Sequence, residues 1–483
     1  MGKKTRLCFA CIAVLALLFS GCGPLGDATG TVPSNGKDAI ANLPTPTLTN
    51  GVAVLKVAVY GLDGSNTSVS AMRKHFLETH PGCAVEVTYY PDRQFPSLDS
   101  SYLSDYYFDD EMRTGPFQMQ FATEMIAGKG ADVIVMAPGL VVNPIVAAQQ
   151  GYFEDLTPYI DNNPDFHPED YYMPVLDAGV VHGKRYYLPM SFSYNPIKST
   201  PEAAEKYGFS IENPFTFDEW FSLAMKTREE TGKPLIYSAL KKTKQHLLFA
   251  LMSGCPLPYD LETDQLYFDT PEFRKGLAFV REMYLNQGLT DGMETDKAFK
   301  EAAAAKWGYV NWATIPFVFD FFVHPEKTES RRFYLMNAPE MKEGQGDMAF
   351  VRQTLAVNSN STQKKLAVEF ALSALQQDTQ LDFYLKLDAN GSIGSNFSFS
   401  PFFLVNTEAN KLLFDYFEKN WNVEPELADQ LLQCLANIKR ALIYDPYLEK
   451  MIDEQIQKYF DGQMTEDELV NVLNQRVNLY MKE

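Results

Sequence analysis

Residues 52–60 read VAVLKVAVY, and this stretch decides the fold class of the chain. Lys56 is the only charged residue in the run, and the others are β-prone or small apolar residues. Such a pattern is typical of a strand buried on both faces, as in the parallel sheet of an α/β domain. Gly61 and Gly64 follow and predict a turn. We therefore expect a central buried strand that ends at Tyr60.

Helix and strand patterns alternate after this strand. Apolar residues at helical spacing precede a second β-prone run, and another helix precedes the run ADVIVM. The order strand–helix–strand–helix–strand predicts a parallel α/β sheet. The expected elements are a helix over 68–80, a strand over 84–90, a helix over 118–127 and a strand over 131–136.

Ligands of parallel α/β sheets bind beyond the carboxyl ends of the strands. The end of the first strand brings Tyr60 and Asp63 to that edge. We expect both as ligand-binding residues, and turn or capping roles are the alternative for the same positions.

Later elements are marked by their caps and by β-prone runs. A Thr followed three residues later by Glu has the spacing of a capping box. This spacing occurs at Thr216 and at Thr465 and predicts that helices start there. Strands are expected over 185–195 and 350–357.

The N-terminus has the composition of a secretory signal. Three basic residues precede an uncharged apolar run over 7–19, and a small pair then precedes Cys22. The run is shorter than the ~20 residues of a membrane span. A small pair before a cysteine resembles the lipobox of bacterial lipoproteins, although Phe19 stands where Leu is usual. The resemblance implies that residues 1–21 are removed as a signal peptide and that Cys22 is acylated; an ordinary cleaved or uncleaved signal is the alternative.

This signal changes the meaning of the six cysteines. Cys8 and Cys11 have the CxxC spacing of a metal or redox motif, but they lie in the apolar run and leave with the signal. Cys83, Cys255 and Cys434 are widely spaced among apolar neighbours, which favours small buried hydrophobic residues over a disulfide framework. One disulfide among these three is left open outside the cytoplasm.

Composition separates a tether from a large folded part. Residues 22–50 comprise Cys22 and a segment rich in Gly, Thr, Pro and Asn, which predicts a flexible tether of ~30 Å. The rest of the chain is larger than one core usually supports, so two lobes are expected. A formal net charge of −20 excludes a general electrostatic footprint for nucleic acid.

Five segments, in this order, resemble the family 1 extracellular solute-binding proteins, which are the receptors of sugar-type ABC importers. Each motif alone is weak, but together they span most of the folded part. The segments are GADVIV (130–135), QGYFEDLTPY (150–159), GKRYYLP (183–189) followed by Tyr194 and Asn195, AVEFALSAL (367–375) and YFDGQMTEDEL (459–469). The acidic segment 91–116 and the aromatic stretch 312–323 depart from the family pattern, which leaves the choice of ligand open.

The resemblance implies an α/β, two-lobe periplasmic-binding-protein-like fold with a hinge and an interlobe cleft. Carried onto this chain, lobe 1 comprises residues 51–192 and 333–395, and lobe 2 comprises residues 193–332 and 396–483. The hinges are expected at Tyr194–Asn195 and at Tyr334–Pro339. Ligand would favour a closed form by hinge motion, and a permease would recognise that form.

The resemblance also implies aromatic rings that stack on a sugar. Trp312 is the leading candidate, because the segment 307–312 resembles the family segment with a sugar-stacking tryptophan, and Trp307 is the second. Tyr194 and Asn195 are further ligand candidates, with hinge geometry as their alternative. For Trp312 the alternative is a core position behind the cleft.

Catalysis and metal binding find little support in the sequence. Neither a GxSxG nor an HExxH motif occurs, and the six histidines are scattered. Asp105, Asp109 and Asp110 lack the alternating spacing of a calcium loop and are expected in a solvated acidic loop. We expect no enzyme, no cofactor and no metal.

These features together predict a monomeric extracytoplasmic receptor that is lipid-anchored to the bacterial cell membrane. Its expected partners are an oligosaccharide, an ABC permease and the lipid bilayer. A secreted lipoprotein enzyme acting on polysaccharide and a surface sensor or adhesion lipoprotein with the same fold are the alternatives.

Overall fold

The computed structural model describes most of the folded part of the chain. The described residues are 36–61, 64–91, 110–136, 140–141, 143–161, 163–194, 196–199, 201–232, 235–237, 265–286, 289–290, 310–312, 334–341, 344–385, 403–421, 425–443 and 445–482. All structural statements below concern these residues.

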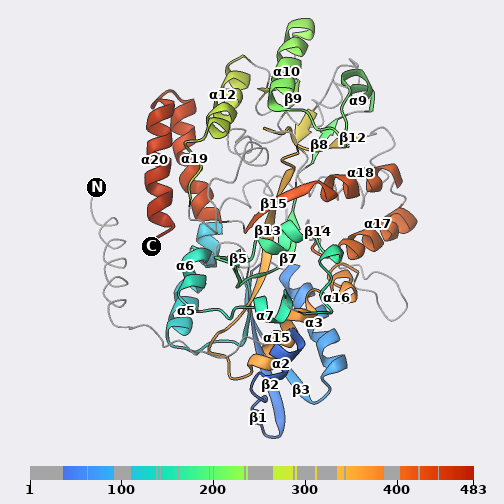
Figure 1. Ribbon diagram of the computed structural model, residues 1–483, viewed down its shortest axis with the longest axis vertical. Coiled ribbons are helices and arrows are strands. Elements are labelled where there is room, and N and C mark those ends of the chain that lie inside the picture. The colour runs from blue at the N-terminus through green and yellow to red at the C-terminus, as the bar shows by residue number, and fades with distance from the viewer. Residues whose placement is uncertain are drawn as a thin grey trace.

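The first of two large sheets has eight strands and occupies the lower and central part of the molecule (Figure 1). Its hydrogen-bonded order is β1-β2-β4-β13-β7-β14, and β3 also pairs with β2 while β15 also pairs with β13. β2 runs parallel to both β3 and β4, which confirms the α/β prediction. The strands are β1 (Leu48–Thr49), β2 (Val52–Gly61), β3 (Cys83–Pro91), β4 (Val133–Met136), β7 (Leu188–Ser193), β13 (Asp347–Val357), β14 (Phe403–Leu404) and β15 (Ile438–Ile443).

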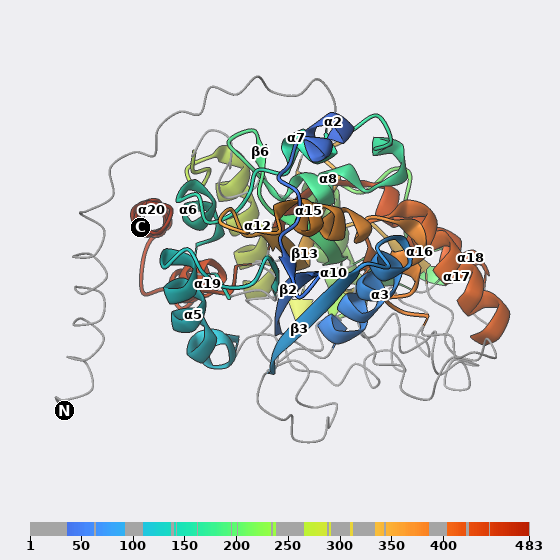
Figure 2. The same cartoon turned by 90° about the horizontal axis from the view of Figure 1, so that it is seen from below.

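Helices cover both faces of this sheet. In the view from below, α3 and α16 lie on one side of β2 and β3, and α5 and α6 lie on the other (Figure 2). A short antiparallel hairpin, β5 (Val180–Val181) and β6 (Lys184–Arg185), lies outside the sheet. The helices around the first sheet are α2 (Gly36–Ala41), α3 (Gly64–Thr79), α5 (Asp110–Ile126), α6 (Pro144–Gln149), α7 (Thr157–Ile160), a 3-10 helix (Pro168–Asp170), α8 (Met173–Asp177), α15 (Lys364–Ser373) and α16 (Gln377–Leu381).

The alternate residues of β2 enter two different hydrophobic clusters. Val57 and Val59 pack in the cluster that contains Phe76 of α3. Tyr60 packs in the second cluster with Phe121 of α5. Because successive side chains of a strand point to opposite faces, this arrangement explains why the sequence of β2 is apolar almost throughout.

The second sheet has five strands in the order β10-β9-β11-β8-β12 and lies in the upper part of Figure 1. β9 is parallel to both β10 and β11, whereas β8 is antiparallel to both β11 and β12. The strands are β8 (Ile197–Ser199), β9 (Ile236–Tyr237), β10 (Leu289–Thr290), β11 (Val310–Trp312) and β12 (Tyr334–Met336), and the helices beside them are α9 (Pro201–Tyr207), α10 (Phe217–Thr231) and α12 (Pro271–Leu285).

Two chain segments cross between the sheets. β7 of the first sheet continues into β8 of the second through residues 194–196, and β12 of the second returns to β13 of the first through residues 337–346. β13 pairs with β15 over its first half, with β4 over its last residues and with β7 along the other edge. The two crossovers lie where the hinges were expected.

The C-terminal part contributes to more than one region. α19 and α20 pack against each other, and α19 also contacts α5 of the first sheet. β14 and β15 come from the segment 396–483 that we expected in lobe 2, and both pair in the first sheet. The lobe boundaries stay a prediction. The remaining helices are α17 (Thr407–Trp421), α18 (Pro425–Ala436), α19 (Pro446–Phe460) and α20 (Glu466–Tyr480).

Both expected capping boxes are confirmed. The Thr216 side chain accepts from the N–H of Glu219 while the Glu219 carboxylate accepts from the N–H of Thr216, and Thr465 and Glu468 repeat this exchange. In the described part of the chain, no helix is both long enough and apolar enough to cross a bilayer.

Three regions differ from expectation. The segment 22–50, expected as a flexible tether, contains α2 and β1, and α2 packs against α7 and α15. α5 begins at Asp110, eight residues before the start expected at position 118, so it includes the end of the acidic segment. The strand expected over 185–195 is divided into β6 and β7, because the N–H groups of Tyr186 and Tyr187 turn to the carbonyl of Gly179. A Cβ on Gly179 would lie 1.9 Å from the carbonyl oxygen of Tyr187, so this close approach requires glycine.

Candidate ligand site and hinge

The carboxyl ends of β2 and β3 form an aromatic edge. The rings of Tyr60 and Tyr90 stack with centroids 4.3 Å apart and planes 4° apart, and Phe121 meets Tyr60 edge-on at 6.0 Å. Tyr60 is 3% exposed, while Tyr89 is 40% exposed at the same edge. Burial, followed by the neighbouring Tyr90 and Glu124, raises the pKa of Tyr60, which therefore stays a neutral phenol.

This geometry places Tyr60 beneath its neighbours at the expected edge. The ring of Tyr90 covers one face of Tyr60, so Tyr60 meets a ligand only if the aromatic edge rearranges. Tyr90 was not singled out from the sequence. The pair Tyr89-Tyr90 at the end of a β-prone run was the available signal, because the edge rule applies to β3 as well as to β2.

The family-like segment 130–135 aligns three strands. The side chain of Asp132 accepts from the N–H of Lys56 at 2.8 Å and from the hydroxyl of Ser361 at 2.7 Å. Its carbonyl accepts from the N–H of Asn358. Asp132 therefore connects the amino end of β4 to β2 and to the segment after β13, away from the carboxyl edge.

The segments 150–159 and 183–189 are joined through Arg185, whose side chain is 2% exposed. The guanidinium donates to Asp161 at 3.0 Å, to Asp177 at 2.9 Å and to the carbonyl of Leu176 at 2.6 Å. The N–H of Arg185 also donates to the hydroxyl of Thr157 at 2.8 Å. This buried cation fixes the ends of α7 and α8 against β6, so its role in the described structure is architectural.

The two crossovers meet at Asp347, the first residue of β13. Tyr194 Oη donates to Oδ2 of Asp347 at 2.5 Å, and Asn337 Nδ2 donates to the same oxygen at 2.9 Å. The N–H of Ala338 donates to Oδ1 of Asp347 at 3.2 Å. Asp347 is 1% exposed and Tyr194 is 2% exposed. We call Tyr194, Asn337, Ala338 and Asp347 the hinge cluster.

The hinge cluster bears on the expected role of Tyr194. Its phenol donates to the carboxylate of Asp347, at the end of the other crossover, and its ring is buried, which supports the hinge alternative over direct ligand contact. Sequence patterns did not single out Asp347 or Asn337. Their partners lie far away along the chain or in a loop without a motif, so no local signal identified them.

The other sequence candidates are less completely described. Trp312 ends β11, and its backbone pairs with Ile197 of β8, directly after the first crossover. The structure describes the backbone of Trp312 but not its side chain. Cys22, Asp63, Asn195 and Trp307 lie outside the described residues, as do Asp105 and Asp109 of the acidic segment.

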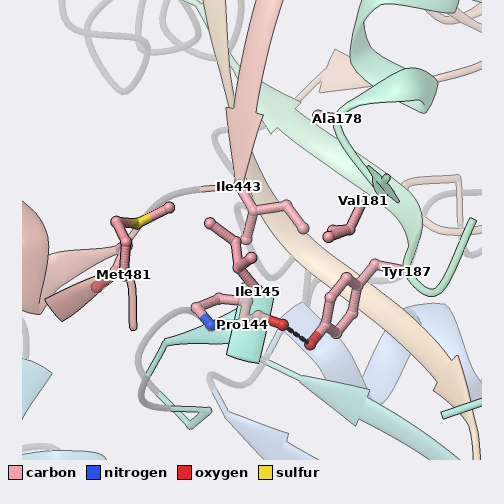
Figure 3. Close-up of a pocket in the computed structure, with 8 residues that line it drawn as sticks. Pro144, Ile145, Ala178, Val181, Tyr187, Ile443 and Met481 are labelled. Atoms are coloured by element: carbon pink, nitrogen blue, oxygen red, sulfur yellow. Dashed lines mark hydrogen bonds between the residues drawn. The ribbon is translucent and has the colours of Figure 1, made fainter. Parts of the chain in front are cut away.

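A small pocket lies between the first sheet and the end of α20 (Figure 3). Tyr187 Oη donates to the carbonyl of Pro144 at its rim. Its volume is about 20 Å³, which holds about one water molecule and no sugar ring. Its lining residues are Pro144, Ile145, Ala178, Val181, Tyr187, Ile443, Asp445 and Met481.

The described ranges contain no cluster of side chains that could bind a metal ion. No group of three or more His, Cys, Asp or Glu side chains converges there in a way that could hold a metal ion. Cys83 and Cys434, the two cysteines within these ranges, are free thiols.

Comparison with known proteins identifies the family. Residues 63–380, more than half of the 483-residue chain, match the family described as bacterial extracellular solute-binding protein. The chain belongs to this family. A separate comparison with curated proteins finds no match for this solute-binding protein.

Solved structures of low sequence identity share the fold of this solute-binding protein. The cyclic alpha-maltosyl-1,6-maltose binding protein from Arthrobacter globiformis has 16% identity and a TM-score of 0.60, over 89% of this chain and 100% of that one. The sugar-binding protein MalE from the phytopathogen Xanthomonas citri has 16% identity and a TM-score of 0.60, over 89% and 97%. A family 1 extracellular solute-binding protein from Alicyclobacillus acidocaldarius has 14% identity and a TM-score of 0.58, over 91% and 100%.

These likenesses confirm the fold class. They match this solute-binding protein to structures over nearly their whole length, and they agree with the two sheets and crossovers seen in the structure. Because fewer than one residue in five is identical, these structures establish the fold of this chain but not the identity of its ligand.

Proposed function

We propose that this solute-binding protein is a lipid-anchored extracytoplasmic receptor that captures an oligosaccharide between two lobes and delivers it to an ABC permease. It acts as a monomer and performs no catalysis. The observation that carries the proposal is the pair of crossovers, β7–β8 and β12–β13, which join two α/β sheets at one buried cluster. Hinge motion about such connections closes a ligand site between lobes.

Three further observations support a carbohydrate as the ligand. The carboxyl edge of the first sheet is aromatic, with Tyr60, Tyr90 and the more exposed Tyr89. Aromatic rings offer the rigid apolar surface on which a sugar ring stacks. Two structures with the same fold are named for maltose-type or sugar ligands. Trp312, the leading aromatic candidate, ends β11 of the other sheet next to the first crossover.

A thermal-shift and calorimetric panel tests the ligand class. We expect stabilisation by one or more oligosaccharides, because a ligand that binds only the folded state raises the free energy of unfolding. Peptides and polyamines serve as the matched negative panel. A response to these alone would reject the carbohydrate proposal and retain the receptor, whereas release of reducing ends from a polysaccharide would favour the enzyme alternative.

Trp312→Ala is expected to weaken binding of the responding sugar by roughly 1–3 kcal/mol while the free energy of unfolding changes little. The reason is that a stacking ring contributes contact area to the ligand and little to the protein core. Calorimetric titration measures the affinity, and urea denaturation measures the stability. Trp220→Ala is the control, because Trp220 is buried in α10 and its loss should lower stability instead. Unchanged affinity for Trp312→Ala would place that ring in the core.

A further inference from the structure

Asp347 is a buried carboxyl group at a contact where both crossovers meet one acceptor. Its oxygens accept from Tyr194 on the first crossover and from Asn337 and Ala338 on the second. The carboxyl group is 1% exposed, so water reaches it only if these two segments separate.

We propose that Asp347 makes the hinge sensitive to pH: protonation of its carboxyl group tightens the contact between the two crossovers, and ionisation loosens it. This inference goes beyond the receptor function and does not depend on the identity of the ligand. It concerns the balance between hinge conformations, which sets how readily a two-lobed receptor opens.

The environment of Asp347 supplies the physical basis. Burial raises the pKa of Asp347 from its ordinary value of 3.8 to about 6, against the opposing effect of the donors and of Arg440 on β15. Burial of the ionised carboxylate costs free energy, and hydration of the carboxylate removes that cost. The protonated group fits the same geometry, because it keeps acceptor oxygens for Asn337 and Ala338 and can donate to Tyr194 Oη.

Tyr194, Cys434 and Arg440, which act on Asp347, keep the same charge state over this range of pH. Burial, followed by the charge of Asp347, raises the pKa of Tyr194 well above its ordinary value and also raises the pKa of Cys434 on α18. Arg440 keeps its positive charge throughout. The remaining charged neighbour is Glu340, whose carboxylate accepts from the N–H groups of Gly344 and Gly346 in the loop of the second crossover.

The sign of the effect follows from linkage. A pKa that is higher in the tight arrangement than in water means that the tight arrangement binds more protons. Lowering the pH from 7 to 5 therefore favours the tight arrangement, and the equilibrium for opening should fall by up to roughly tenfold. The same linkage makes the contribution of Asp347 to global stability largest below pH 4 and lost as the pH rises through 6.

Hydrogen–deuterium exchange of the ligand-free protein tests the proposal. After correction for intrinsic exchange rates, peptides covering 188–194 and 334–347 should be several-fold more protected at pH 5 than at pH 7. In Asp347→Asn, protection should be the same at both values of pH. Equal protection at both pH values in the wild type, or a pH effect that persists in Asp347→Asn, would overturn the proposal.

Two control variants separate Asp347 from its neighbours. Asp445→Asn removes another buried carboxyl group with a raised pKa, which caps α19 and accepts from Tyr480. Glu340→Gln neutralises the second carboxylate of the crossover. Both should retain the pH effect at the hinge, and its loss in either would contradict the assignment.

A second variant keeps the test decisive if Asp347→Asn does not fold. Tyr194→Phe removes a hydrogen bond that lowers the pKa of Asp347, so the midpoint of the protection change should move to higher pH. An unmoved midpoint would exclude Asp347 as the group responsible.

Discussion

Arg185→Ala is expected to lower the free energy of unfolding by about 3 kcal/mol. The substitution removes three hydrogen bonds from a guanidinium that is 2% exposed, and it leaves Asp161, Asp177 and the carbonyl of Leu176 without their cation. Hydrogen bonds to charged groups contribute more than neutral ones, and a buried ion pair is costly to break from one side. Because both carboxylates are partly exposed, the expected loss of stability lies at the lower end of the range for breaking a buried ion pair from one side.

The neighbouring residue provides a matched control. Lys184 precedes Arg185 in β6 and is exposed, so Lys184→Ala should change the free energy of unfolding by less than about 0.5 kcal/mol. Urea denaturation of the two variants and the wild type measures the difference. Coincident transitions for all three proteins would show that Arg185 does not hold α7 and α8 against β6.

Cys22→Ala is expected to move the protein completely from the membrane fraction to the soluble extracytoplasmic fraction. The prediction follows from the position of Cys22 directly after a small pair that ends the apolar run. Labelled palmitate should be incorporated into the wild type and not into the variant, because acylation needs the thiol of Cys22. Stable membrane anchoring requires at least two acyl chains or signals. Because replacement of Cys22 removes the residue that is acylated, the variant should have no lipid anchor.

Cys8→Ala is the matched control for this experiment. Cys8 lies inside the apolar run and belongs to the proposed signal, so its replacement should preserve both labelling and membrane association. A Cys22→Ala protein that stays in the membrane fraction after a high-salt wash would contradict the anchor and favour an uncleaved signal.

Local sequence patterns predicted the central elements because their signals are local. The apolar run of β2 reflects burial on both faces, with Val57 in one cluster and Tyr60 in the other. The capping boxes at Thr216 and Thr465 are exchanges between residues three apart. Each of these features depends on neighbours in the chain, which a sequence displays directly.

The contacts that define the hinge depend on distant residues and were not predictable in the same way. Asp347 meets Tyr194, which lies 153 positions away along the chain, and nothing in either local sequence indicates the pair. Arg185 and Lys184 are adjacent basic residues, and only the packing of β6 shows that the first is buried and the second exposed. Tyr60 was expected at the ligand edge, but the stacking of Tyr90 over it became visible only when β2 and β3 were paired.

Small-angle X-ray scattering with and without a sugar from the binding panel tests the central claim, that two lobes close around an oligosaccharide. At a sugar concentration that saturates the site by calorimetry, we expect a smaller radius of gyration, because hinge closure brings the two sheets and their helices together. An unchanged radius of gyration at full saturation would contradict closure, and the absence of binding by any oligosaccharide would contradict the proposed ligand.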